Sequence, residues 1–336
     1  MITEIFSPET YRGLATIHLF YYIACLGCTL ALLLLLRNIM PCDQGRAFAV
    51  NGELSKGKTR GVGLLFILGF TIPTFLFVKI TWELAILLLL LLACMLTGYL
   101  DDAGSVPWSG LKKGILDLAI ALGAGFAAWK FYGTKVSFHL FTVKSGYGFD
   151  VAASIKLPAP IYIILAAALV WGAINVVNCT DGVDGLCTSL AIVALVAFGR
   201  LGSAGGMSLG VGNGVIATGM IMCLIPYLWF NASPSTMLMG DAGSRALGFL
   251  FAMLALRSGY MLECIPICII FILDGGLGLL KLALLRSVKI HILKNVRTPL
   301  HDHARKNLKW GDAQTVFRFV LVQISVILLY FTIIVA

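Results

Sequence analysis

Long apolar runs separated by short polar segments dominate this chain. Ten stretches are apolar over most of the roughly 20 residues that a helix needs to cross a bilayer. They cover residues 14–36, 62–78, 83–100, 114–130, 158–175, 186–200, 210–230, 244–258, 261–285 and 315–335. The pattern predicts an all-α polytopic membrane protein with about ten transmembrane helices, folded as a single integral membrane domain over residues 1–336.

The longest connecting segment on one side, residues 131–157, follows a different pattern. Residues 135–141 alternate between polar and apolar side chains, and a segment with two glycines follows at 144–148. Alternation with a period of two indicates a strand, and glycine indicates a turn. We therefore expect a short hairpin in this loop, lying on the outer surface of the membrane.

Composition agrees with a membrane protein, because only 12% of the residues are charged and a soluble domain has about 25%. Basic residues indicate the orientation. One set of connecting segments, which includes Arg245, holds 15 of the 25 basic residues, and the other set, which includes Arg257, holds eight. The richer side should be cytoplasmic, and an even number of helices then places both termini outside. The net charge of +9 follows from this bias and from anionic lipid, so it does not indicate nucleic acid.

The polar segment at residues 175–185 interrupts the apolar pattern most strongly. It follows an apolar run directly and contains Asn175, Asn178, Asp181 and Asp184. Charged groups at membrane depth are costly and usually functional. Because nothing in the segment is basic, we expect its acids to need a partner from outside the chain, and a divalent cation is the natural candidate.

Other acids fall at the predicted cytoplasmic ends of apolar helices, beside glycine or small residues. Asp101 and Asp102 end one helix, and Asp241 precedes another. Helix capping could explain one or two acids, Asp184 and Asp241 in particular. It does not easily explain an adjacent pair at a helix C-terminus, where the dipole disfavours anions. The set suits Mg²⁺, which takes one or two carboxylates and fills its shell with water and phosphate.

Basic and imidazole side chains lie in the predicted cytoplasmic segments, on the same face as these acids. Acids that hold a metal, next to lysines at a membrane surface, are typical of phosphoryl transfer. His301 and His303 follow a proline in a loop with seven basic residues, and they are candidates for binding a pyrophosphate or a sugar. Lys112 and Lys113 follow Asp102 by one short loop, and Lys56, Lys58 and Arg60 precede the second apolar stretch.

Three motifs resemble those of the polyprenyl-phosphate N-acetylhexosamine-1-phosphate transferase family. Residues 175–186 read NVVNCTDGVDGL and are similar to the family's NxxNxTDGxDGL, and residues 98–102 read GYLDD and are similar to its GxxDD. Residues 230–244 are similar to its FNxxPAxxFMGDxGS. The histidine segment, with residues 310–319, most resembles the branch that transfers a phospho-N-acetylmuramoyl-pentapeptide. The resemblance extends over about residues 54–319.

The resemblance implies an enzyme of peptidoglycan synthesis in the bacterial plasma membrane, with its active site on the cytoplasmic face. Undecaprenyl phosphate would attack the β-phosphate of UDP-MurNAc-pentapeptide, UMP would leave, and the product would be lipid I. It also implies a homodimer and Mg²⁺ as the cofactor, with Asp241, Asp102 and Asp184 as ligands. The implied catalytic residues are Asp101, Asp102, Asp241 and Lys56. The implied substrate-binding residues are Lys113, Asn175, Asn178, Asp181, Asp184, Asn231, His301 and His303.

The chain departs from the family in two motifs. Arg60 replaces a proline in the segment similar to LSKxGTPTMGG, so that Lys56 is the matching lysine. Asp302 replaces the middle histidine of the histidine motif, and Ala304 and Arg305 replace an aromatic residue and an acid. The same chemistry on UDP-GlcNAc is therefore the nearest alternative. A lipid-binding scaffold is a second alternative. A secondary transporter is a third, although it would carry its acids near the bilayer midplane on inverted repeats.

Overall fold

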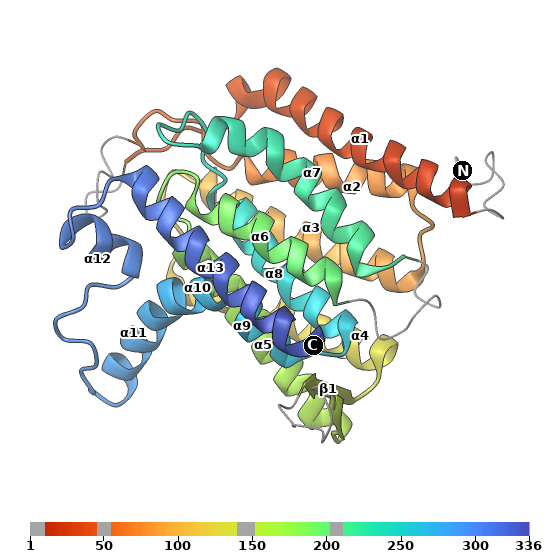
Figure 1. Cartoon of the computed structure of the whole chain (residues 1–336). Helices are drawn as coiled ribbons and strands as arrows, with labels where there is room; N and C mark the ends of the chain where they lie inside the picture. Colours follow the sequence, from red (N-terminus) through yellow and green to blue (C-terminus); the bar gives the residue numbers. More distant parts are fainter. Residues whose placement is uncertain (1–10, 46–54, 140–151, 202–210, 336) are drawn as a thin grey trace.

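The computed structural model describes residues 11–45, 55–139, 152–201 and 211–335. Most of the described residues belong to helices that pack into one bundle (Figure 1). The helices are α1 (Tyr11–Leu36), α2 (Gly63–Phe77), α3 (Trp82–Asp102), α4 (Gly110–Tyr132), α5 (Ala159–Thr180), α6 (Leu186–Arg200), α7 (Asn213–Asn231), α8 (Gly240–Ser258), α9 (Cys264–Ile267), α10 (Ile269–Phe271), α11 (Leu277–Ser287), α12 (Leu300–Lys306) and α13 (Asp312–Val335). Two 3₁₀ segments, η2 (Arg37–Ile39) and η5 (Met261–Glu263), and a π-helix, η6 (Ile272–Gly276), complete them.

Six helices in the described part of the chain are long and apolar enough to cross a membrane, namely α1, α3, α4, α5, α7 and α13. A bent segment between Met261 and Ser287 could be a seventh. Helices α2 and α6 have 15 residues each, which gives about 22 Å against a hydrocarbon core of about 30 Å. The prediction of about ten transmembrane helices is therefore not confirmed, although a helix lies at each predicted stretch.

Helix α8 lies in the middle of the bundle, and all 19 of its residues are buried. It packs against α2, α3, α4 and α5. Arg245 forms a buried ion pair with Asp117 of α4, and Arg257 forms one with Glu83 of α3 at 2.7 Å. Counting these two arginines as loop residues was wrong, because both lie inside the protein, where a charge persists only when it is paired. Each set of connecting segments loses one basic residue, so the excess of basic residues on the predicted cytoplasmic side remains.

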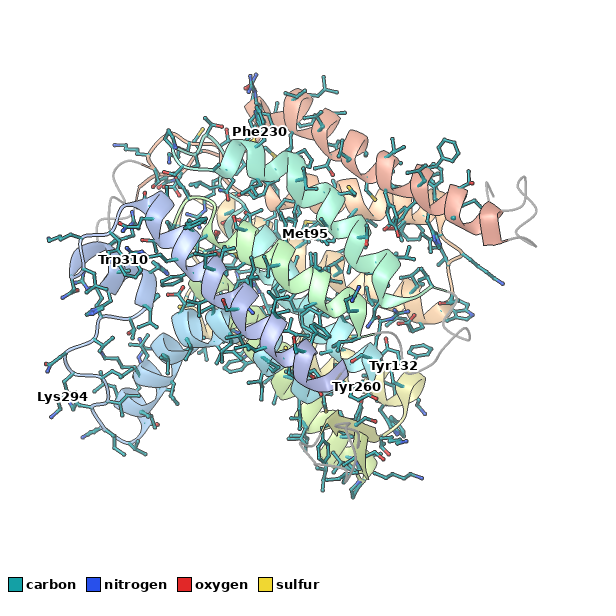
Figure 2. The ribbon with its side chains drawn as sticks, in the orientation of Figure 1. Met95, Tyr132, Phe230, Tyr260, Lys294 and Trp310 are labelled. Atoms are coloured by element: carbon teal, nitrogen blue, oxygen red, sulfur yellow. The ribbon has the colours of Figure 1, made fainter. Side chains whose placement is uncertain are left out.

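Strands β1 (Lys135–His139) and β2 (Ala152–Lys156) pair antiparallel, with Lys135 opposite Lys156. Both lie within the predicted loop, and the segment between them falls outside the described residues. The strands lie at the end of the bundle where α4 ends (Figure 1). Tyr132 and Tyr260 mark this end, and Phe230 lies toward the other (Figure 2). The placement of the strands outside the membrane stays a prediction.

The chain bends by 75° within the segment from Met261 to Ser287. The bend follows α9, and the π-helix η6 comes before α11. As a result α11 points away from the bundle, and α12 lies to one side of it (Figure 1). This arrangement places α12 next to the polar loop between α5 and α6, which contains Gly182.

Candidate active site

Helix ends bring five charged side chains together at one end of the bundle. Asp101 and Asp102 end α3, Lys113 lies in the first turn of α4, Asp241 lies in the first turn of α8, and Arg60 precedes α2. The Nζ atom of Lys113 lies 2.5 Å from Oδ2 of Asp101 and 2.8 Å from Oδ2 of Asp241. The Nε atom of Arg60 lies 2.8 Å from Oδ1 of Asp102, and its Nη2 lies 3.8 Å from Oδ1 of Asp241. We call these five residues the charged cluster.

Two glycines allow α3 and α8 to approach closely enough to form the cluster. A Cβ atom on Gly98 would lie 2.4 Å from the carbonyl oxygen of Asp241. Gly240 has a φ of +66°, and a Cβ atom on it would lie 2.2 Å from Oδ2 of Asp102. Only glycine tolerates both the space and this backbone conformation. The small residues beside the acids in the sequence therefore serve the contact between these helices.

Asp102, the last residue of α3, caps the N-terminus of helix α8. Its Oδ1 accepts a hydrogen bond from the backbone N–H of Asp241 at 3.1 Å, and its Oδ2 accepts one from Ala242 at 3.0 Å. An anion at a helix N-terminus is stabilised by unpaired N–H groups and by the helix dipole. The expectation that capping does not explain this acid was wrong, because Asp102 ends α3 but caps α8.

A second ion pair lies in the loop after α5. Oδ2 of Asp184 accepts from Nζ of Lys58 at 3.0 Å and from the backbone N–H of Ser235 at 2.9 Å. Burial alone would raise the pKa of Asp184, but the hydrogen bonds from Ser235 and the ammonium of Lys58 lower that pKa below its usual value. The expectation that these acids have no partner within the chain was therefore wrong for Asp184. Its partner lies far away in the sequence.

Several predicted residues lie apart from the charged cluster. Lys56 is exposed, and within the described part of the chain it forms no ion pair, whereas Lys58 and Arg60 of the same segment do. The side chain of Asn175 donates to the carbonyl of Trp171 in its own helix at 2.8 Å. Asp181 is half-buried and follows the last residue of α5. The geometry thus favours Lys58 and Arg60 over Lys56 as the basic residues of the site.

The other two predicted carboxamides, Asn178 and Asn231, differ in their surroundings. Asn178 donates to Oγ of Ser244 at 3.2 Å and hydrogen-bonds with Asp241, so it borders the charged cluster. Asn231 is buried, and its Oδ1 accepts from the N–H of Gly185 at 3.2 Å and from Oγ1 of Thr188 at 2.8 Å. Its Nδ2 donates to the carbonyl of Met237 at 3.0 Å. Because the protein uses both ends of this carboxamide, Asn231 holds the loop before α6, and its geometry does not support the predicted ligand contact.

His301 and Asp274 form a buried pair that brings α12 to η6. The Nδ1 atom of His301 lies 2.8 Å from Oδ2 of Asp274, and the backbone N–H of His301 donates to Oδ1 at 2.7 Å. A Cβ atom on Gly182 would lie 2.3 Å from Nε2 of His301, so the imidazole edge faces the polar loop. Sequence reasoning missed Asp274. A lone acid inside an apolar stretch was the available signal, since such residues are usually functional.

The rest of the histidine motif holds the surrounding loops. Nδ1 of His303 accepts from the backbone N–H of Arg297 at 3.3 Å. Arg305 pairs with Asp312 at 2.7 Å and donates to the carbonyl of Gly182 at 3.3 Å. Arg305, one of the departures from the family pattern, therefore ties the polar loop to the start of α13.

The chemistry of the donor set can be compared with the requirements of Mg²⁺. Among the described residues, no three His, Cys, Asp or Glu side chains converge as a ready metal site. Asp101 and Asp241, however, each direct one carboxylate oxygen to the same cation, the ammonium of Lys113. Two carboxylates of this kind suffice for Mg²⁺ when phosphate and water complete its shell. Of the predicted ligands Asp241 fits best, because Asp102 caps α8 and Asp184 pairs with Lys58.

The chain is similar to known proteins over most of its length. Residues 84–259 match glycosyl transferase family 4. The chain is similar to the phospho-N-acetylmuramoyl-pentapeptide-transferase of Treponema pallidum (strain Nichols), with 36% identity over 299 residues, which cover 85% of this chain and 80% of that protein. It is similar to the protein of the same name from Heliobacterium modesticaldum, with 30% identity over 266 residues, 76% of this chain and 77% of that protein. The protein of this name from Chlorobaculum parvum is 29% identical over 291 residues, 79% and 77% of the two chains.

Proposed function

Because the chain belongs to the phospho-N-acetylmuramoyl-pentapeptide transferases of glycosyl transferase family 4, we propose that it transfers phospho-MurNAc-pentapeptide from UDP-MurNAc-pentapeptide to undecaprenyl phosphate. The product is lipid I, and UMP leaves. The protein is an enzyme and a multi-pass membrane protein of the bacterial type. The observation that carries the proposal is the convergence of Asp101 and Asp241 on Lys113 at one end of the bundle.

Three cations of the site suit the diphosphate of the donor. Lys113, Arg60 and Lys58 lie at the same end of the bundle and are each only partly exposed, with 27%, 18% and 19% of the side chain accessible. Partly buried cations interact more strongly with phosphate than exposed ones, because water screens them less. In the structure the ammonium and guanidinium groups donate hydrogen bonds to carboxylates. When the donor substrate binds, its phosphate oxygens accept some of these hydrogen bonds instead.

The acceptor phosphate attacks the β-phosphorus of the donor. A new P–O bond forms between the lipid phosphate and the β-phosphorus, the bond between the α- and β-phosphates breaks, and UMP carries away its electron pair. Direct attack needs no covalent enzyme intermediate. We assign to Asp101 and Asp241 the task of orienting the ammonium of Lys113 toward the phosphates. Asp102 keeps α8 in position, since both of its oxygens accept from that helix.

Mg²⁺, held by Asp241 and Asp101, would neutralise charge that develops on the phosphate oxygens. The Nε2 edge of His301 faces the loop at Gly182, and we assign it to the sugar-phosphate part of the donor. Asn178 lies beside Asp241 and completes the side of the site that faces the donor. The site would open to the cytoplasm, both termini would lie outside, and the enzyme would form a homodimer.

Two adjacent lysines provide a matched test of this site. Lys113 contacts both carboxylates, whereas Nζ of Lys112 lies 3.5 Å from the ring centre of Trp108. Lys113→Gln should lower the rate of UMP release about 10²- to 10³-fold, the typical effect of removing one donor that stabilises developing charge. Lys112→Gln should leave the rate within about twofold, because Lys112 is exposed and a cation–π contact at an exposed site contributes little. Equal rates for the two variants would contradict the proposed site.

The donor sugar is tested separately. UMP release is measured with UDP-MurNAc-pentapeptide and with UDP-GlcNAc, each with undecaprenyl phosphate and Mg²⁺. Release with the muramoyl donor alone supports the proposal. Release with UDP-GlcNAc alone would overturn the donor assignment and leave the chemistry of the site unchanged.

A further inference from the structure

Helix α11 and the loop after it leave the bundle and expose apolar side chains. Within α11 only Gly278 is buried. Leu280, Leu282 and Leu285 are 48%, 47% and 37% exposed, and Ile290 in the following loop is 53% exposed. Apolar side chains that the protein leaves uncovered are typical of a segment that lies against lipid. Figure 2 shows Lys294 in the loop beyond this helix, far from the rest of the bundle.

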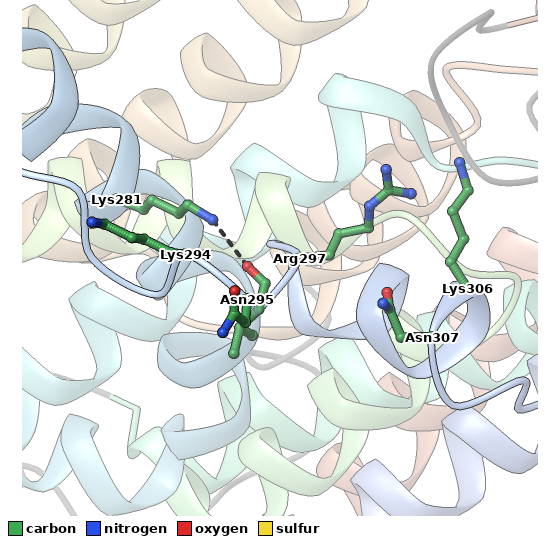
Figure 3. Close-up of a pocket in the computed structure, with 7 residues that line it drawn as sticks. Lys281, Lys294, Asn295, Arg297, Lys306 and Asn307 are labelled. Carbon is green, nitrogen blue, oxygen red and sulfur yellow. Dashed lines mark hydrogen bonds between the residues drawn. The ribbon is translucent and has the colours of Figure 1, made fainter.

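A basic pocket lies where this loop meets α12. It is an open depression of about 450 Å³, and four of its seven lining residues are cations (Figure 3). The cations are Lys281, Lys294, Arg297 and Lys306, and none of the lining residues is acidic. Asn295 and Asn307 add carboxamides. Four positive charges around one depression favour an anion with several oxygen atoms.

Lys281 shapes this pocket from within the apolar helix. Its Nζ donates to the carbonyl of Leu293 at 3.0 Å and to that of Val296 at 2.9 Å, which holds the loop against α11. These partners are neutral carbonyls, so they leave the positive charge uncompensated. A lysine on an apolar helix reaches toward the polar boundary of a membrane in this way. The pocket therefore joins a basic loop to the exposed apolar side chains of α11.

We propose that this pocket binds the head-group phosphate of an anionic membrane phospholipid. The cations contact the phosphate, and an acyl chain lies along the exposed leucines of α11. A soluble anion would explain the charges but would leave the apolar surface beside them without a partner. Basic pockets next to membrane helices recognise anionic head groups through the same combination. The proposal does not depend on the donor or acceptor of the reaction.

Native mass spectrometry of the full-length protein tests this site directly. The protein is titrated with phosphatidylglycerol in the presence of phosphatidylcholine, and the retained lipid is counted. The test variant is Lys294→Gln/Arg297→Gln/Lys306→Gln. Lys281 is left unchanged because it holds the loop. The matched control is Lys135→Gln/Lys156→Gln/Lys309→Gln, which removes three charges at exposed lysines outside the pocket.

The test variant should bind phosphatidylglycerol on the order of a hundredfold more weakly, because each basic residue near an anionic surface contributes about fivefold. The control should bind like the wild type. Unchanged lipid binding by the test variant would overturn the proposal. So would displacement of the lipid by inorganic pyrophosphate in the wild type, together with a higher KM for the nucleotide donor in the test variant. Unchanged circular dichroism, together with a smaller loss in the single variant Lys294→Gln, shows that the effect is local.

Discussion

Replacing Asp274 by Asn should reduce activity without unfolding the protein. Asp274 is fully buried and accepts two hydrogen bonds from His301, one from its backbone N–H and one at Nδ1. With a carboxylate at this position, Nδ1–H donates, and Nε2 is left to accept a proton or a hydrogen bond. The amide keeps the oxygen for the backbone bond but directs its NH₂ to Nδ1. The proton then moves to Nε2, and the edge that faces Gly182 changes from acceptor to donor.

The size of the effect follows from the bond that is lost. A hydrogen bond to a charged group contributes about 1.5 to 3 kcal/mol, so kcat/KM for UMP release should fall about tenfold to hundredfold. The thermal midpoint in detergent should change little, because the amide has the same shape and removes a buried charge. The control is Asp312→Asn, whose partner is Arg305 and whose side chain is 26% exposed. An ion pair of that kind contributes about 1 kcal/mol or less, so activity should stay within about fivefold.

The reasoning fails if Asp274→Asn keeps the kcat/KM of the wild type while His301→Ala loses activity. In that case His301 would act without its buried partner. It also fails if the thermal midpoint falls in parallel with activity, because the carboxylate would then serve the fold and not the orientation of the imidazole.

Three further outcomes follow from the other ion pairs. Asp102→Ala removes the cap of α8 and should cost about 1 to 3 kcal/mol, measured as a lower thermal midpoint. Arg245→Met or Asp117→Leu alone should each cost about 3 to 5 kcal/mol, and the double variant should recover most of the loss, because a single change leaves a buried charge unpaired. The pKa of Asp184 is lowered in the folded protein, so its contact with Lys58 stabilises the fold above the usual pKa of about 3.9 and is lost as the pH falls through the lowered pKa. The difference in thermal midpoint between the wild type and Asp184→Asn should be constant between about pH 5 and 8 and shrink below about pH 4.

Helix ends were the part of the site that could be predicted from the sequence. The apolar period fixes where α3 ends and where α8 begins, and Asp101, Asp102 and Asp241 lie at those points. The partners of these acids could not be predicted, because they lie far away in the chain. Arg60 is 42 residues from Asp102, and Lys58 is 126 residues from Asp184. The motif points to Lys56, but a short motif does not tell which basic residue faces the bundle, and in the structure Lys58 and Arg60 form the ion pairs.

Hydropathy alone did not establish the number of transmembrane helices, for a related reason. An apolar helix surrounded by protein and one surrounded by lipid have similar compositions, and α2 and α6 differ from the longer helices mainly in length. Asp274 could not be recognised by its position at a helix end, as the other acids could, because it lies inside a helix that bends.

The two buried arginines of α8 also bear on how the chain is made. The acid that pairs with Arg245 lies 128 residues earlier in the chain, and the acid that pairs with Arg257 lies 174 residues earlier. A carboxyl group can enter lipid in its neutral, protonated form, whereas a guanidinium stays charged and is costly in an inserting helix, by up to about 2.5 to 3.5 kcal/mol at the helix centre. Synthesis from the N-terminus therefore places Glu83 and Asp117 in the membrane before either arginine leaves the ribosome. We expect α8 to insert efficiently only behind α3 and α4, so that nascent chains with Glu83→Leu and Asp117→Leu would leave this helix outside the bilayer.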